Sequence, residues 1–294
     1  MPPLDLVGLT RVMQRTEGRA AFVVGLIDGP VETSHPDLVS AHLRPLSPAR
    51  KVSCRIADSA ACAHGTMVAG ILFARRGTGA PAICPGCTFV IRPIFHEQHP
   101  GRGSSATAPP EELAKAIVDT VNAGARVINL SSGLPRGAAV AGQDALSHAL
   151  SFAAQRGVLV VVAAGNQSSV AGSCITQHPW VIPVASCDAG GLPSAHSNVS
   201  SSIGRQGLLA PGDHIRSLAP GYSFTTFSGT SAACPFVSGA IALLWSEHRH
   251  LTATQIRQAV LGVGARSSVV PPLLNAWEAW RRVAEIAKKG REAA

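Results

Sequence analysis

Nearly continuous runs of apolar residues recur along the chain, and each is short enough to be a strand. Alternation would indicate a sheet with one solvent-facing side, whereas a continuous run indicates a strand that is covered on both faces. The runs are found at residues 22–27, 89–94, 126–130, 158–164 and 180–186. Because strands of this kind are typical of parallel sheets, the pattern predicts a mostly parallel α/β sheet.

Helical segments separate these runs. Residues 110–122 begin with a proline and two acids, which make a favourable first turn, and Thr252 is a good cap for a helix over 252–261. The other helices are predicted at residues 4–19, 64–73, 143–156, 231–247 and 272–289, a further strand at 222–227, turns at 197–198 and 210–212, and loop with short strands over 36–63. No repeat or linker divides the chain, so we expect a lead-in helix over residues 1–20 and a single domain over 21–290.

Polar residues stand at the ends of these apolar segments. Asp28 and Asn166 each follow a predicted strand, His64 opens a predicted helix, and Ser231 begins another after a Gly-Thr turn. Each has an ordinary interpretation: a turn residue for Asp28 and Asn166, a structural histidine, and a helix cap for Ser231. However, the free N–H groups at a helix start stabilise negative charge, which favours a serine nucleophile there.

The chain order Asp28, His64, Ser231 is that of one type of Ser-His-Asp site. The local motifs Ile27-Asp28-Gly29, His64-Gly65-Thr66-Met67-Val68-Ala69-Gly70, Ala163-Ala164-Gly165-Asn166 and Ser228-Gly229-Thr230-Ser231-Ala232-Ala233-Cys234-Pro235 resemble those of the subtilases. Residues 127–133 and 209–212 also match, and the resemblance covers roughly residues 20–262. It implies a three-layer subtilisin-like α/β fold, with a central, mostly parallel sheet flanked by helices.

The resemblance also implies a role for each site residue. Ser231 would attack the scissile carbonyl, His64 would take and return the proton, and Asp28 would fix the imidazole. The amide of Asn166 and the backbone N–H of Ser231 would hold the oxyanion. The substrate peptide would bind along Ser131, Ser132 and Gly133, as an edge strand, and along Ala164 and Gly165.

Within the subtilases, Asp28-Gly29-Pro30-Val31 followed by Ser34-His35-Pro36 resembles the proteases of cyanobactin-type peptide maturation clusters. That resemblance implies a serine endopeptidase that removes the leader of a ribosomally made precursor peptide. A transpeptidase or macrocyclase is an alternative, but macrocyclising relatives carry a helical cap for which the interval from Asp28 to His64 looks too short. An inactive peptide-binding partner is the other alternative, and the complete set of site residues speaks against it.

The chain departs from the family pattern beside the proposed nucleophile. Ala232 stands where many subtilases have methionine, so sulfoxide formation cannot occur there and tolerance to peroxide is expected. Cys234 is expected to be a small core residue. No cofactor is required and no metal ligand is predicted at the site. The calcium sites common in the family cannot be mapped onto the chain because no dense acidic loop appears, so structural calcium is left open.

The net charge of +8 fits either an ordinary solvated surface or an acidic leader peptide as substrate. Dispersed basic residues and 4% aromatic residues argue against nucleic-acid binding. No apolar run is long enough for a membrane span, and residues 1–19 lack the pattern of a secretion signal, so a cytoplasmic location is expected. No oligomeric state is predicted.

The seven cysteines are free thiols by default in such a compartment. Cys84-Pro85-Gly86-Cys87 precedes a predicted strand, whereas a thioredoxin-like site would open a helix. One such pair is half a zinc site, which Cys54, Cys62 or histidines would have to complete. Local disulfides, such as Cys54 with Cys62 or Cys174 with Cys187, are an alternative, although the connectivity cannot be read from the sequence.

Overall fold

The computed structural model describes residues 1–46, 53–56, 59–98, 108–131, 142–266 and 269–292. Its centre is a sheet of seven parallel strands in the order β2-β3-β1-β4-β5-β6-β7. The strands are β1 Val23–Asp28, β2 His42–Pro45, β3 Thr88–Pro93, β4 Val127–Leu130, β5 Leu159–Ala163, β6 Ile182–Cys187 and β7 Leu208–Pro211. The predicted parallel α/β sheet is therefore confirmed.

Both faces of the sheet are covered, which explains why its strands are apolar at successive positions. In β5, Leu159 and Val161 pack into the core on one face, and Val160 and Val162 pack into the core on the other. Every residue of β5 is thus buried, because neighbouring side chains on a strand point to opposite faces. A one-sided sheet would have required polar residues at two of these four positions.

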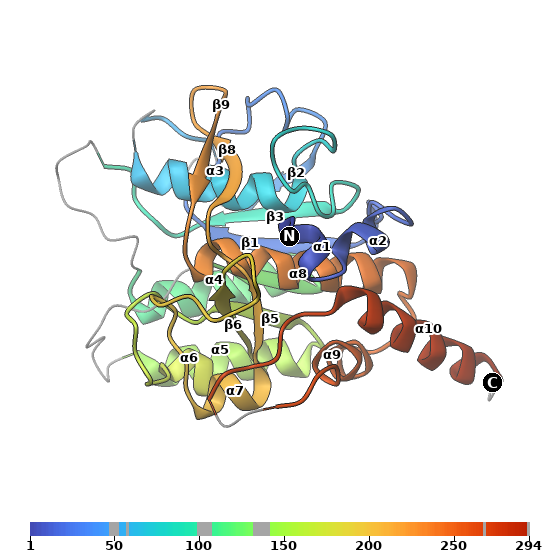
Figure 1. Cartoon of the computed structure of the whole chain (residues 1–294). Coiled ribbons are helices and arrows are strands. Elements are labelled where there is room, and N and C mark those ends of the chain that lie inside the picture. Colours follow the sequence, from blue (N-terminus) through green and yellow to red (C-terminus); the bar gives the residue numbers. More distant parts are fainter. Residues whose placement is uncertain (47–52, 57–58, 99–107, 132–141, 267–268, 293–294) are drawn as a thin grey trace.

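Helices form the layers on both sides of the sheet (Figure 1). Helices α3 and α8 supply the core on one face, with α2, α9 and α10 packed around them, and α4 and α5 supply the core on the other face. The helices are α1 Pro3–Leu6, α2 Leu9–Met13, α3 Ala60–Phe73, α4 Pro110–Asn122, α5 Gln143–Gln155, α6 Cys174–Gln177, α7 Ser201–Gln206, α8 Thr230–Glu247, α9 Ala253–Leu261 and α10 Ala276–Glu292.

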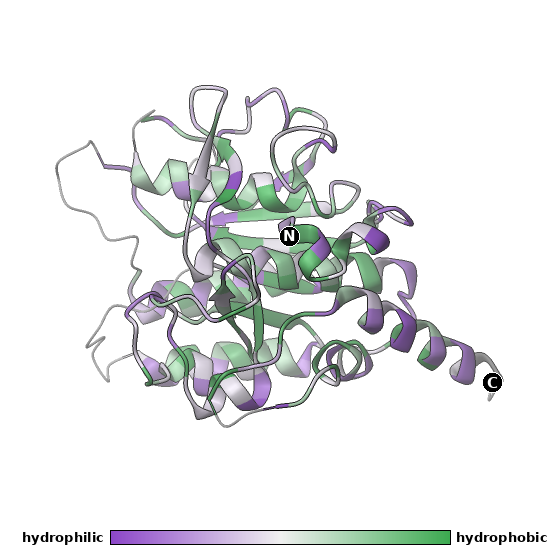
Figure 2. Cartoon of the chain, viewed as in Figure 1, coloured by the Kyte–Doolittle hydropathy of each residue, from purple (hydrophilic) through white to green (hydrophobic). Residues whose placement is uncertain are grey.

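Apolar residues concentrate in the sheet and in α8, whereas the outer part of α10 is hydrophilic (Figure 2). A two-stranded antiparallel hairpin, β8 Ile215–Ala219 and β9 Ser223–Phe227, lies beside α3 and leads directly into α8. Within the described residues, every helix is either too short or too polar to span a lipid bilayer.

The strand order changes direction at β1. The chain goes from β1 to β2 and β3 on one side, and then crosses to β4 on the other side of β1. In open α/β sheets, ligands bind beyond the carboxyl ends of the strands at such a reversal. Asp28 ends β1, and Ser131 directly follows β4, so both lie at this place in the fold.

Several local predictions are wrong. Residues 4–19 do not form one helix, because Gly8 adopts a left-handed conformation with φ of 68° between α1 and α2. The helix predicted to open at His64 begins at Ala60, so His64 lies in its second turn. Residues 210–211, predicted as a turn, end strand β7, and Pro211 is tolerated because β7 lies at the edge of the sheet.

Candidate active site

Two glycines let the end of β1 lie against the backbone of α3. A Cβ at Gly29 would overlap the carbonyl oxygen of Ala61, and a Cβ at Gly65 would overlap backbone oxygens of the turn that follows β1. Any larger residue at either position would push the strand end and the helix apart. This close approach places Asp28, the last residue of β1, beside His64 on α3.

Asp28 and His64 are joined by a hydrogen bond of 2.6 Å between the carboxylate Oδ1 and the imidazole Nδ1. A carboxylate only accepts, so Nδ1 carries the proton and Nε2 keeps its lone pair. Asp28 is fully buried, and its Oδ1 also accepts the backbone N–H of Gly29 at 2.6 Å. Phe95 meets the imidazole edge-on, with 6.4 Å between ring centroids. The orientation and the tautomer of His64 are therefore both fixed.

The pKa of His64 results from opposing effects. Burial disfavours the charged imidazolium and would lower the pKa, whereas the charge of Asp28 and its hydrogen bond raise it. The effect of Asp28 prevails, so the pKa of His64 lies above its ordinary value. The side chain is 21% exposed, which leaves it accessible to a bound peptide.

Ser231 is the second residue of α8, a helix whose remaining residues are almost all buried. The first N–H groups of a helix have no partner inside it, so the N–H of Ser231 is available to an anion. The thiol of Cys234, one turn later, donates to the carbonyl oxygen of Leu130 at 3.8 Å, which places this end of α8 against the carboxyl end of β4, the strand next to β1. Among the described residues, His64 and Ser231 share no hydrogen bond, which is common in catalytic sites before a substrate binds.

A buried hydrogen bond fixes α8 against the sheet beneath this site. Ser238 on α8 donates to Oδ1 of Asn129 on β4 at 2.7 Å, and Nδ2 of Asn129 donates to Oγ of Ser131 at 2.7 Å. All three side chains are buried. The helix that carries Ser231 is thus held in register with the strand next to β1.

Asn166 follows β5 and is tied to the turn before Ser231. Its Oδ1 accepts the backbone N–H of Thr230 at 2.8 Å and the Thr230 hydroxyl at 3.0 Å. Because a backbone N–H can only donate, the atom that faces it must be the amide oxygen, and the amide nitrogen points away. The Asn166 side chain is exposed, so its N–H₂ group is available next to the start of α8.

The predicted substrate-binding residues are only partly described. Ser131 is buried, while Ser132 and Gly133 lie outside the described residues, so the prediction that this segment pairs with substrate is not tested. Ala164 and Gly165 are buried, and the backbone oxygens of both accept hydrogen bonds from Asn198. The sequence predicted Asn198 only as a turn residue.

The two unusual neighbours of Ser231 are both inaccessible. Ala232 and Cys234 are fully buried, and burial raises the pKa of the Cys234 thiol well above its ordinary value. The thiolate is the form that attacks peroxide, so Cys234 is expected to be inert. The prediction that Cys234 is a core residue is confirmed.

We expect the protein to keep most of its activity in a peroxide concentration that inactivates an Ala232→Met variant. The methionine would offer a thioether beside the nucleophile, and the native chain has none there. Residual peptide hydrolysis after timed exposure measures the effect. Rapid loss of activity in the native protein, if Cys234→Ala prevents it, would show that peroxide oxidises the buried thiol after all.

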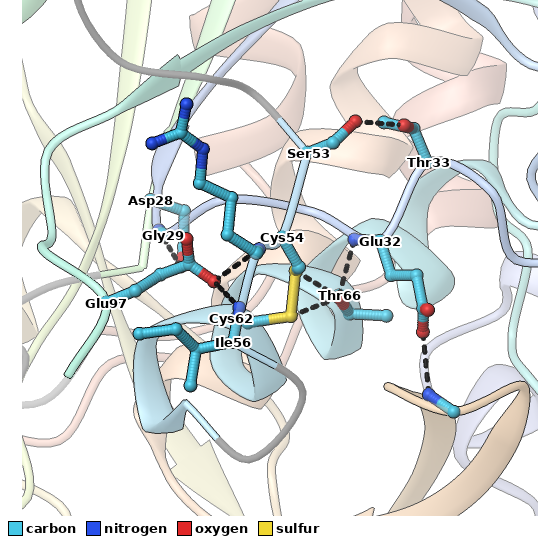
Figure 3. Close-up of a disulfide and its surroundings, with 12 residues drawn as sticks. Asp28, Gly29, Glu32, Thr33, Ser53, Cys54, Ile56, Cys62, Thr66 and Glu97 are labelled. Atoms are coloured by element: carbon cyan, nitrogen blue, oxygen red, sulfur yellow. Dashed lines mark hydrogen bonds between the residues drawn. A yellow bond between two sulfur atoms is a disulfide. The ribbon is translucent and has the colours of Figure 1, made fainter. Parts of the chain in front are cut away.

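A disulfide joins Cys54 to Cys62 in the first turn of α3, two residues before His64 (Figure 3). Hydrogen bonds also hold the segment that carries Cys54. The N–H of Cys54 donates to the carbonyl oxygen of Val31, and Oε1 of Glu97 accepts the N–H groups of Arg55 and Ile56. Of the two predicted pairings this one is confirmed, and Cys174 with Cys187 is wrong, since both are free.

The bridge also bears on the zinc alternative. Among the described residues, Cys54, Cys62 and Glu97 form the one group with ligand atoms close enough to share a metal ion. Their two sulfurs are bonded to each other, so they are not metal ligands in this state. Cys84 and Cys87 are fully buried free thiols, and β3 follows them as predicted.

Replacing both Cys54 and Cys62 by serine is expected to lower the free energy of unfolding by about 2.5 kcal/mol, the loop-closure value for so short a loop. Urea unfolding measures the change, and native protein treated with a reductant should behave like the variant. Cys174→Ser, which removes a free thiol, is the matched control. Equal unfolding midpoints for native and doubly substituted protein would contradict a stabilising bridge.

The profile of the subtilase family matches residues 19–263 of the chain. Subtilisin DY from Bacillus licheniformis is 29% identical over 259 residues, which cover 86% of this chain and 87% of the relative. The chain spans 58% of the length of several other curated subtilisins that it matches.

Two solved structures share the fold over nearly the whole chain. The patellamide maturation protease PatA is 33% identical with a TM-score of 0.76, covering 91% of this chain and 98% of that one. The prenylagaramide maturation protease PagA is 29% identical with a TM-score of 0.79, covering 94% and 98%. With its fold, its Asp28–His64 pair and a family profile that spans most of its length, the chain belongs to the subtilase family and is a subtilisin-like serine protease.

Proposed function

We propose that this protease cleaves a ribosomally made precursor peptide and removes its leader, with Ser231 as nucleophile, His64 as base and Asp28 as the group that orients the base. The hydrogen bond of 2.6 Å between Asp28 and His64 carries the proposal, because it leaves Nε2 of His64 free to accept a proton. The likeness to PatA and PagA, both maturation proteases, supports the class of substrate.

The site residues then act in a definite order. Nε2 of His64 takes the proton from the Ser231 hydroxyl as Oγ attacks the scissile carbonyl carbon, and the imidazolium that forms is stabilised by Asp28. Negative charge develops on the carbonyl oxygen, where Nδ2 of Asn166 and the N–H of Ser231 donate to it. His64 then protonates the leaving amine, and water releases the acyl group by the same steps in reverse. No cofactor is needed for any step.

Hydrolysis is favoured over macrocyclisation by the segment before α3. Its described residues between Asp28 and Ser59 contain strand β2 and no helix that would cap an acyl-enzyme. A precursor peptide treated in H₂¹⁸O should therefore yield a leader fragment whose new carboxylate contains ¹⁸O, as read by mass spectrometry. A cyclic product that lacks the added water would replace hydrolysis with transpeptidation, and an uncut peptide would remove the proposed function.

We propose that the net charge of +8 attracts an acidic leader peptide. Added salt screens such an attraction, so kcat/KM should fall as the salt concentration rises. A kcat/KM independent of salt would remove that support. We also propose a cytoplasmic location, which is supported by five of the seven cysteines being free thiols, whereas the Cys54–Cys62 disulfide is more typical of an oxidising compartment.

A further inference from the structure

Asn198 lies beneath the loop that carries Asn166 and is almost fully buried, with 7% of its surface exposed. Its side-chain Oδ1 accepts the backbone N–H groups of Gln167 at 2.9 Å and Ser169 at 3.0 Å. Its Nδ2 donates to the carbonyl oxygen of Ala164 at 3.1 Å and to Oε1 of Gln167 at 2.7 Å. The side chain therefore binds the loop on both sides of Asn166.

The backbone of Asn198 adds a further bond to the same loop, because its N–H donates to the carbonyl oxygen of Gly165 at 2.9 Å. Gly165 has a φ of 102°, and a Cβ there would lie 2.5 Å from Nδ2 of Asn198, so the loop and this side chain are in close contact. Only an amide supplies both the two acceptor and the two donor sites used here.

Asn166 itself is exposed, and so surrounding packing does not hold it. On one side, Thr230 fixes its Oδ1. On the other side, its backbone belongs to a loop, residues 164–169, in which five hydrogen bonds run to Asn198 and others run to His196, Val199 and Thr230. An oxyanion donor must be held in place before the reaction to stabilise the developing charge. Asn198 makes hydrogen bonds to residues on both sides of Asn166, and so it is the side chain best placed to fix the backbone that carries the amide.

We propose that Asn198 is a positioning residue that acts through Asn166 to align the oxyanion donor. This inference rests on the proposed role of Asn166. A positioning role and a merely structural role predict different results. If Asn198 acts through Asn166, the loss of kcat on removing Asn198 should depend on whether Asn166 is present.

Removing Asn166 is expected to lower kcat by about 10²–10³-fold, the loss known for this donor in a subtilisin. Asn198→Ala should lower kcat by about tenfold or more, but by less than the removal of Asn166 itself, and it should leave KM nearly unchanged. It should also weaken binding of a peptide boronate, which mimics the tetrahedral intermediate, by a similar factor. In an Asn166→Ala background, the same substitution should have no further effect on kcat.

Asn275→Ala is the matched control, because Asn275 caps α10 through a hydrogen bond of 3.0 Å to the N–H of Glu278 and does not contact the loop. It should lower stability without lowering kcat. If Asn198→Ala does not fold, Asn198→Asp keeps the acceptor but turns a carboxylate oxygen toward the carbonyl oxygen of Ala164, and a loss of kcat with the same dependence on Asn166 is expected.

A kcat equal to that of the native protein, or an equal loss with and without Asn166, would overturn the inference. Neither result touches the proposed function, which is tested separately by the cleavage of a precursor peptide by the native protein.

Discussion

Replacing Ser231 by alanine is expected to lower kcat for peptide hydrolysis by about a millionfold, the loss known for the nucleophile of a subtilisin. The reason is that no acyl-enzyme can form without Oγ, and the remaining donors stabilise only attack by water. The fold should persist, because a small side chain replaces a small one at a half-buried position in the first turn of α8. Single-turnover kinetics on a precursor peptide would measure the loss.

Ser223→Ala is the control for this substitution, since Ser223 lies on β9 and its hydroxyl donates to the carbonyl oxygen of Pro220. Its kcat should remain close to that of the native protein. A Ser231→Ala variant that retains native activity would show that another group is the nucleophile.

Asp28→Asn is expected to lower kcat by about 10⁴-fold, as is known for this change in another serine protease. The asparagine amide can donate to Nδ1 of His64, which would move the imidazole proton to Nε2 and leave it unable to accept from Ser231. The pH dependence should change as well. His64 must be neutral to act as a base, so kcat/KM rises with pH through the pKa of His64 in the free enzyme.

In the native protein that pKa is raised, because the effect of Asp28 exceeds that of burial. In Asp28→Asn the charge is gone and burial remains, so the pKa should fall and the acidic limb of the profile should move to lower pH. A profile of kcat/KM against pH for both proteins measures the shift. An acidic limb that stays in place would mean that Asp28 does not set the pKa of His64.

The sequence predicted the sheet well for a physical reason. Strands buried on both faces must be apolar at successive positions, and this local pattern marks β1, β3 and β5 whatever their neighbours are. Local signals also placed α4 over the predicted residues 110–122 and the cap of α9 at Thr252, whose side chain accepts the N–H of Gln255. Asp28 and Ser231 were predicted because each stands at the end or start of such an element.

What the sequence could not predict depends on contacts between distant segments. The contact between Gly29 and α3, which places Asp28 beside His64, involves residues that are far apart in the chain. Asn198 looked like a turn residue, because its partners are the loop about thirty residues earlier. Helix α3 was predicted to begin too late, since residues 60–63 were assigned to the preceding loop and only the packing of the helix marks its start.

Labelling with a fluorophosphonate, which reacts with activated serines, tests the central claim most directly. The Asp28–His64 pair should activate the Ser231 hydroxyl, so the folded protein should take up one label on the peptide that contains Ser231. Unfolded protein and the Ser231→Ala variant should take up none. A label on another residue, or no label on protein that is folded and cleaves peptides, would contradict the account.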